Sequence, residues 1–351
     1  MNIVEIISQY WGSAVFSFGL AFLLIVLALF VFPKIGLMDR PAKYGLFRKP
    51  IPYYGGVMIF LAFFVSVLIF VPLDRELIGF LIGAFLVAGV GFLDDYFDLS
   101  PLIRLVLQFV AALILVICGV GILSINLPFL GVLDFSQLVF GGIMVLSALF
   151  TIVWVMVTIN VMNFLDGVSG LNSSVTFVAA LTLFFLSIHP NLHADPASQV
   201  PVATIALIVA MIALAFLIFD FPKPKILMGD TGSTFFGFVL ATLAIFSGGK
   251  VATAFLVLGI PILDMIWVVL RRLFSGQKIW KGDLKHLHHR LLDLKMSAKG
   301  VVLVYLLISA ALGGGAILLV SSQQKLFMII ALILLMVVMG TAIVLSARKR
   351  V

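Results

Sequence analysis

Residues 81–100 read LIGAFLVAGVGFLDDYFDLS, a long apolar run that ends in three acids. With the residues just before it, the run approaches the roughly 20 residues that a helix needs to cross a bilayer. Asp94 and Asp95 stand at its end, and Asp98 follows one helical turn later. The stretch predicts a membrane-spanning helix that carries carboxylates at the membrane surface.

The whole chain has a membrane composition. Of its 351 residues, 63% are hydrophobic and 11% are charged, with a mean hydropathy of +1.29. A soluble domain carries about 25% charged residues, so the sequence predicts an integral membrane protein. Cys118 is the single cysteine, which excludes a disulfide framework and a cysteine-based metal site. We find no separate soluble part and expect one membrane domain over 1–351.

Apolar stretches of nearly spanning length recur along the chain. They lie at about 12–32, 55–72, 77–93, 102–121, 139–159, 168–188, 200–219, 232–248, 251–270, 300–320 and 326–346. Lipid offers the backbone no hydrogen-bond partners, so each stretch is expected to be a helix. The prediction is an all-α, polytopic membrane protein with about eleven transmembrane helices.

The basic residues predict the orientation. Nineteen of the twenty-two Lys and Arg residues follow the odd-numbered spans or lie at the C-terminus, and only Arg75, Lys250 and Lys325 lie on the opposite side. The positive-inside rule then places the N-terminus outside and the C-terminus in the cytoplasm. Topology and anionic lipid headgroups account for the net charge of +7 without nucleic acid. The same face could attract polyanionic substrates.

Acids and other polar side chains gather on the predicted cytoplasmic side. An active site is expected from the loops at about 34–54, 94–104, 159–170, 219–233 and 271–299. Acids at helix ends can simply be solvated at the interface. Charge near membrane depth is costly, however, so acids at several helix ends on one face favour a functional site.

Three motifs suggest separate tasks within that site. Neighbouring residues on a helix point about 100° apart, so Asp94 and Asp95 cannot do the same work. Asn160 and Asn163 share a helical face, which Asp166 continues one turn later. Within GDTGS, residues 229–233, an acid lies at the start of a helix, where free N–H groups and the helix dipole favour anions. A carboxylate beside a phosphate suggests a bridging Mg²⁺, or Mn²⁺, since all the ligands would be oxygens.

The histidines of GDLKHLHHRLL form a further cluster. His286, His288 and His289 could bind zinc, but no cysteine lies nearby to support such a site. The neighbouring Lys and Arg residues, among them Arg290, favour hydrogen bonds to a phosphate, sugar or base instead. Asp264 is the one acid well inside a predicted span, and its role is left open between structure and function.

Four motifs in this order resemble those of the polyprenyl-phosphate N-acetylhexosamine-1-phosphate transferases. They are GFLDDYFDLS (91–100) with Arg104 and Gln108 following, NVMNFLDGVSGL (160–171), KILMGDTGS (225–233) and HLHHRLL (286–292). The resemblance covers about residues 12 to 346, including the eleven-span topology. HLHH is similar to the WecA and TagO branch, whereas the related MraY proteins carry a different three-histidine pattern.

This resemblance implies an enzyme of the cell envelope. It would transfer an N-acetylhexosamine-1-phosphate, with UDP-GlcNAc as the expected donor, to undecaprenyl phosphate and release UMP, in the first membrane step of a glycan pathway. We expect a multi-pass protein of the bacterial cytoplasmic membrane whose active site faces the cytoplasm. Membrane lipids are further partners, a homodimer is possible, and nucleic acid is not a partner.

The charge that this reaction must neutralise suggests roles for the acids, and the resemblance suggests the residues that bind the donor. Asp230 is expected to be the principal Mg²⁺ ligand with Asp95 assisting, and Asp94 would deprotonate or orient the lipid phosphate. The remaining polar residues of the motifs are expected to bind the donor: Asn160, Asn163, Asp166, Lys225, His286, His288, His289 and Arg290.

Some positions depart from the family pattern. Tyr44, Gly45 and Phe47 replace the usual Arg-Lys-x-His residues of the first loop, where Arg48 and Lys49 are candidates to substitute. Elsewhere Arg104 replaces Lys, Ser169 replaces Asp and Asp220 replaces Asn. Ser169 and the altered loop leave the donor sugar open.

Two alternative functions remain. One is MraY-like transfer of phospho-MurNAc-pentapeptide. The other is a membrane transporter, which predicts ionisable groups near the bilayer midplane and paired broken helices rather than acids at one face.

Overall fold

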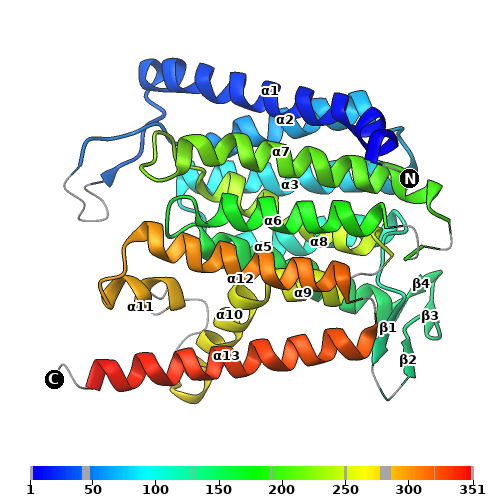
Figure 1. Cartoon of the computed structure of the whole chain (residues 1–351). Coiled ribbons are helices and arrows are strands. Elements are labelled where there is room, and N and C mark those ends of the chain that lie inside the picture. The colour runs from blue at the N-terminus through cyan, green and yellow to red at the C-terminus, as the bar shows by residue number, and fades with distance from the viewer. Residues whose placement is uncertain are drawn as a thin grey trace.

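A computed structural model shows a mostly helical bundle (Figure 1). It describes residues 3–41, 48–127, 129, 131–189, 192–193, 195–248, 251–276, 286–319 and 321–348. The helices are α1 (Ile3–Ile35), α2 (Gly55–Phe70), α3 (Arg75–Phe97), α4 (Pro101–Ile117), α5 (Val145–Leu165), α6 (Leu171–Ser187), α7 (Val200–Asp220), α8 (Gly229–Phe246), α9 (Val251–Val257), α10 (Gly259–Phe274), α11 (Leu287–Asp293), α12 (Ala298–Leu318) and α13 (Ser322–Arg348), with a 3₁₀ turn η2 (Ala197–Gln199) before α7.

The length and apolar composition of the helices support the prediction of an integral membrane protein. Within the described residues, seven are long and apolar enough to cross a membrane, and α9 and α10 form an eighth candidate that is bent by 83° at its break. Three further apolar helices, α2, α4 and α6, are shorter than 18 residues. Each of the eleven predicted stretches overlaps one of these helices or the bent pair. The number eleven and the orientation of the termini stay predictions.

The prediction of a wholly α-helical fold is wrong for residues 124–144. This region forms the antiparallel pairs β1 (Ser124–Leu127) with β2 (Gly131–Asp134), and β3 (Val139–Phe140) with β4 (Ile143–Met144). Gly141 and Gly142 both have positive φ, 57° and 81°, as a tight hairpin turn requires. A short apolar run has no periodicity that separates a strand from a helix, so the span expected at 139–159 starts too early.

A buried helix, α8, lies at the centre and contacts α2, α3 and α5. Gly91 of α3 permits one of these close approaches. A Cβ atom at Gly91 would lie 2.6 Å from the Cα atom of Thr231 and 2.8 Å from the carbonyl oxygen of Asp230. Because no side chain separates the two backbones, the acids at the end of α3 lie beside the first turn of α8.

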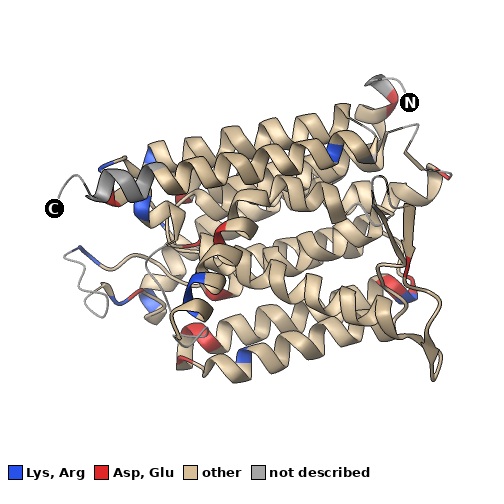
Figure 2. Ribbon diagram, turned by 90° about the horizontal axis from the view of Figure 1, so that it is seen from below, with Lys and Arg blue, Asp and Glu red and all other residues tan. Residues whose placement is uncertain are grey.

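The connections α3–α4, α5–α6 and α7–α8 lie at one end of the bundle, together with the end of α1, the start of α2, the end of α10 and the start of α11 (Figure 1). The helix α13 finishes at this end as well. Most of the Lys and Arg segments lie at this end too (Figure 2). The β-strands lie at the opposite end. The fold therefore brings the predicted active-site loops together, although positions 42–47 and 277–285 of those loops, which include Tyr44, Gly45 and Phe47, fall outside the described residues.

Candidate active site

A cavity of about 880 Å³ opens at the end of the bundle where these loops meet. Six of the residues predicted from the sequence line it, and they come from three separate segments: Asn160, Asn163, Asp166, Asp230, His286 and His289. Ser169 and Asp220, two of the positions that depart from the family pattern, line it as well. The tertiary structure thus gathers motifs that are up to about 130 residues apart in the chain.

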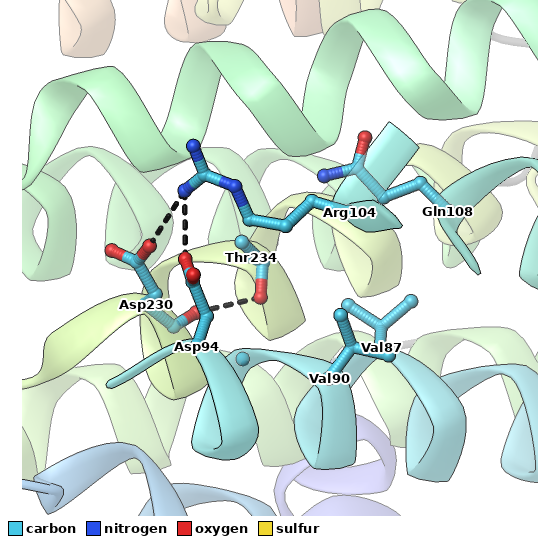
Figure 3. Close-up of a pocket in the computed structure, with 8 residues that line it drawn as sticks. Val87, Val90, Asp94, Arg104, Gln108, Asp230 and Thr234 are labelled. Carbon is cyan, nitrogen blue, oxygen red and sulfur yellow. Dashed lines mark hydrogen bonds and ion pairs between the residues drawn. The ribbon is translucent and has the colours of Figure 1, made fainter. Parts of the chain in front are cut away.

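A buried carboxylate, Asp94, shares a cation with Asp230 next to this cavity (Figure 3). Nη1 of Arg104 lies 2.7 Å from Oδ2 of Asp94 and 3.1 Å from Oδ2 of Asp230. The backbone N–H of Leu99 donates a second hydrogen bond to Asp94, at 2.8 Å. One guanidinium from α4 therefore bridges acids from α3 and α8, which would otherwise repel each other at short range.

The adjacent Asp95 has a different environment. Its Oδ1 accepts hydrogen bonds from the Tyr53 hydroxyl and the Asp230 N–H, each at 2.8 Å. Its Oδ2 accepts from the N–H and the hydroxyl of Thr231, at 3.0 and 2.7 Å. A carboxylate offers about four lone-pair sites, so these four donors use them all. Instead of directing a carboxylate oxygen at a cation, Asp95 caps α8 in this arrangement, and its role as a metal ligand stays a prediction.

The local backbone explains how Asp95 reaches α8. Gly229, the first residue of α8, has a φ of +73°, and a Cβ atom there would lie 2.6 Å from Oδ2 of Asp95. Only glycine leaves room for the carboxylate and adopts this conformation without strain. Burial and the carboxylate of Asp95 raise the pKa of Tyr53, so its hydroxyl remains a hydrogen-bond donor at neutral pH.

The two predicted asparagines point to different partners. Asn163 donates to Oδ1 of Asp230 at 2.9 Å and lies 3.2 Å from the Ser233 hydroxyl. Asn160, one turn earlier on α5, donates to Oε1 of Gln108 on α4 at 2.8 Å. Both side chains line the cavity. Their common helical face, which the spacing predicts, is present in α5.

Two further acids lie near the start of α6. Asp220 accepts hydrogen bonds from the Gly170 N–H at 2.8 Å and the Ser173 hydroxyl at 3.0 Å, and so holds the beginning of that helix. Asp166 lines the cavity. Burial, followed by the nearby charges of Asp220, Asp230 and Asp95, raises the pKa of Asp166 well above its ordinary value.

The three histidines divide between the cavity and the protein interior. His286 and His289 line the cavity, whereas His288 is only 1% exposed and is absent from its lining. Both ring nitrogens of His288 are buried without a hydrogen-bond partner among the described residues. Burial, and then the neighbouring histidines, lower its pKa to about 3, so its imidazole is neutral at physiological pH. This position favours a packing role for His288 over the predicted contact with substrate.

Lys225 and Arg290, the two predicted basic ligands, are also absent from the cavity lining. The Lys225 ammonium lies 5.9 Å from the centre of the Phe219 ring. Arg104 and Arg272 are the basic residues that line the cavity among those described. Arg272 lies in the last turn of the apolar helix α10, and its sequence neighbourhood carries no motif that would single it out. The sequence likewise assigns no role to Asp264, whose side chain hydrogen-bonds His286.

The donor set suits a hard divalent cation. Among the described residues, no group of three or more His, Cys, Asp or Glu side chains could enclose a metal ion. Mg²⁺ is usually held by one or two carboxylates, with waters and substrate phosphates completing its shell. The carboxylate of Asp230, 30% exposed at the side chain and facing a cavity lined by amides and cations, fits this type of site.

Comparison with known proteins places the chain among membrane transferases. The profile of Glycosyl transferase family 4 matches residues 77–248. An undecaprenyl-phosphate alpha-N-acetylglucosaminyl 1-phosphate transferase of Salmonella typhi is 31% identical over 301 residues, covering 81% of this chain and 75% of the relative. A probable undecaprenyl-phosphate N-acetylglucosaminyl 1-phosphate transferase of Bacillus subtilis (strain 168) is 29% identical over 283 residues, covering 79% and 75%. A decaprenyl-phosphate N-acetylglucosaminephosphotransferase of Mycobacterium tuberculosis is 29% identical over 304 residues, covering 77% and 72%.

Proposed function

The chain belongs to the family of polyprenyl-phosphate N-acetylhexosamine-1-phosphate transferases, and from this premise we propose that it transfers GlcNAc-1-phosphate from UDP-GlcNAc to undecaprenyl phosphate. UMP is the second product. The observation that carries the proposal is the position of Asp230. Its carboxylate faces the cavity from the first turn of α8, between the amide of Asn163 and the guanidinium of Arg104.

The reaction joins two anions. An oxygen of the lipid phosphate forms a bond to the β-phosphorus of the donor, and the bond from that phosphorus to the oxygen of the α-phosphate breaks. UMP leaves with the bonding electron pair. Such a transfer depends mainly on positioning and on neutralising charge. The cations that line the cavity, Arg104 and Arg272, supply part of that neutralisation.

Mg²⁺, or Mn²⁺, would supply the rest, by offsetting the charge of the diphosphate and of the leaving UMP. Asp230 would hold it, and Asp94 is the candidate for a second carboxylate, because the two acids share Arg104 as a partner. In this proposal Asp94 orients the lipid phosphate or accepts its proton. Asp95 would act by fixing the start of α8, on which Asp230 stands.

The donor is bound, in this proposal, by the cavity residues of α5 and α11. Asn163 and Asp166 would hold the nucleotide, while His286 and His289 face the diphosphate or the sugar. The names of the three relatives all specify N-acetylglucosamine, which favours UDP-GlcNAc as the donor. Ser169 lines the same cavity, so this departure from the family pattern lies where it could change the choice of amino sugar.

The proposed setting is the cytoplasmic membrane of a bacterium, with eleven spans, the N-terminus outside and the C-terminus in the cytoplasm. The gathering of basic segments at the end of the bundle that carries the cavity supports this orientation (Figure 2). The enzyme would there meet a water-borne nucleotide sugar and a membrane-bound phosphate. A homodimer and membrane lipids remain the proposed partners, and the product would enter a cell-envelope glycan pathway.

A donor panel tests the function. The purified protein, in detergent with Mg²⁺ and undecaprenyl phosphate, is given UDP-GlcNAc, UDP-GalNAc or UDP-MurNAc-pentapeptide, and UMP is measured. We expect UMP from UDP-GlcNAc only when both the lipid phosphate and Mg²⁺ are present. UMP from the pentapeptide donor would instead identify an MraY-like enzyme. No UMP from any donor, together with uptake of intact nucleotide sugar into proteoliposomes, would make the protein a transporter.

A further inference from the structure

A buried side-chain hydrogen bond links Asp264 to the histidine motif. Oδ2 of Asp264 lies 2.9 Å from Nδ1 of His286, and Oδ1 accepts a hydrogen bond from the Leu287 N–H, also at 2.9 Å. Asp264 is 7% exposed and His286 is 6% exposed. One carboxylate therefore satisfies both a ring nitrogen and a free N–H in the first turn of α11.

The location of this acid in an apolar helix requires an explanation. Asp264 lies on α10, the second half of the bent pair, in the sequence GIPILDMIWVVL. Removing a carboxylate from water costs several kcal/mol unless donors replace the water. The bend of 83° between α9 and α10 sets the direction of α10, and α10 carries the carboxylate to the start of α11. Both hydrogen bonds of Asp264 are made with the histidine motif, and they offset the free-energy cost of burying its carboxylate.

The ring of His286 is fixed on its faces as well as at Nδ1. Its centre lies 5.0 Å from the Phe164 ring at an interplanar angle of 31°, and 5.7 Å from the His288 ring at 2°. With Nδ1 directed at Asp264, Nε2 on the other side of the ring is left for the cavity that His286 lines. A carboxylate accepts but does not donate, so it keeps the imidazole proton on Nδ1 and the Nε2 lone pair open.

We propose that Asp264 is a positioning residue that holds His286 in this tautomer, so that Nε2 accepts a hydrogen bond from a hydroxyl or amide N–H of the nucleotide-sugar donor. The inference rests on the proposed function. It adds which partner donates and which accepts in the hydrogen bond between His286 and the nucleotide sugar. His286 is then an acceptor for the neutral part of the donor, and the phosphates are left to Arg104 and Arg272.

The Asp264→Asn variant separates this role from simple capping of α11. An amide retains one acceptor oxygen, which the Leu287 N–H can still use, so the start of α11 is preserved. The amide NH₂ group would then face Nδ1 of His286 and donate to it. The ring proton moves to Nε2, which can no longer accept from the donor. Asp264→Ala removes both bonds and serves as the comparison for loss of the cap.

Steady-state kinetics give the first readout. We expect Asp264→Asn to raise the KM for the nucleotide sugar about tenfold with little change in kcat, since one lost hydrogen bond that is made equally in the ground and transition states weakens uniform binding. In a His286→Ala background the same substitution should leave KM unchanged. A wild-type KM in Asp264→Asn, or an equal rise in the His286→Ala background, would overturn the proposal.

Nuclear magnetic resonance of ¹⁵N-histidine-labelled protein gives a readout that does not need turnover. The His286 signals, assigned by their absence from His286→Ala, should show the proton on Nδ1 in the wild type and on Nε2 in Asp264→Asn. An Nε2 proton in the wild type would overturn the proposal. Failure of the proposed function would look different, because the wild type would then release no UMP from any donor while the tautomer could still be read.

Discussion

Oδ2 of Asp95 accepts two hydrogen bonds from Thr231, one from its backbone N–H at 3.0 Å and one from its hydroxyl at 2.7 Å. These bonds connect the end of α3 to the first turn of α8. Asp230, the residue before Thr231, is thereby held with its side chain toward Arg104 and Asn163. The two adjacent acids of the motif therefore have different roles. Asp94 shares Arg104 with Asp230, whereas Asp95 holds the helix on which Asp230 stands.

Thr231→Val tests this connection. The valine side chain has a similar shape but no hydroxyl, so Asp95 loses one of its four donors. Since a hydrogen bond to a charged group contributes about 1.5–3 kcal/mol, the melting temperature should fall by several degrees. Thr234→Val is the matched control, because among the described residues that hydroxyl donates only to the Asp230 carbonyl of its own helix, at 2.6 Å. Equal losses in the two variants would contradict the role of Asp95 as a cap.

Gly91→Ala tests the close approach of α3 and α8. The new methyl group would lie 2.6 Å from the Thr231 Cα atom, so one helix must shift. We expect a loss of stability of about 1–3 kcal/mol, as in other overpacked cores, together with a loss of UMP release. Gly89→Ala, two residues earlier on the same helix, meets no atom within 4 Å and should retain both properties. Normal activity in Gly91→Ala would show that the spacing of the two backbones is not critical.

Asp230→Asn tests the metal assignment. The amide keeps the size of the side chain but loses the charge that would bind Mg²⁺. Turnover should fall by at least about 100-fold, since the charge stabilisation that a bound metal provides is worth several kcal/mol. The variant should still elute as a folded protein from size-exclusion chromatography in detergent. Retention of most of the activity, measured as UMP release with saturating Mg²⁺, would exclude Asp230 as the principal ligand.

Arg104→Met tests competition between the guanidinium and the divalent cation. Arg104 bridges Asp94 and Asp230 in the structure, so its removal leaves two neighbouring carboxylates without their shared cation. The variant should melt at a lower temperature than the wild type without Mg²⁺. Added Mg²⁺ should then raise the melting temperature of the variant more than that of the wild type, since ligands stabilise the state they bind. Equal shifts would argue that the cation does not bind at these carboxylates.

Asp166 predicts a pH dependence of stability. Its pKa is raised in the folded protein by burial and by neighbouring carboxylates, above the ordinary value of about 3.9 in the unfolded chain. Between these two values the folded state binds more protons, so this group's contribution to stability decreases as the pH rises and is most favourable below the unfolded pKa.

Asp166→Asn removes that contribution. Melting temperatures measured from pH 5 to pH 8 should therefore rise in the variant relative to the wild type as the pH increases. A constant difference over this range would contradict the raised pKa. The comparison cancels the titration of all other groups to the extent that they do not contact Asp166.

The sequence alone predicts the positions of most helices and many of the candidate site residues, because both depend on local chemistry. The apolar stretches predict the helices because lipid requires each segment to satisfy its own backbone, and every predicted stretch overlaps a helix or the bent pair. The motif residues Asp230, Asn163 and His286 were found as a group because charged and amide side chains at the ends of apolar helices are costly without a purpose. The strands at 124–144 were missed because a short uncharged run fits either structure.

Only the tertiary structure decided which of those residues face the cavity. Asp94 and Asp95 are neighbours in the chain, but the approach of Gly91 to α8 turns one toward Arg104 and the other toward Thr231. His288 is buried between two cavity residues, and Asp264 reaches His286 across 22 positions of the chain. Side-chain direction and long-range pairing depend on how helices pack against one another, and no local pattern in the sequence encodes that packing.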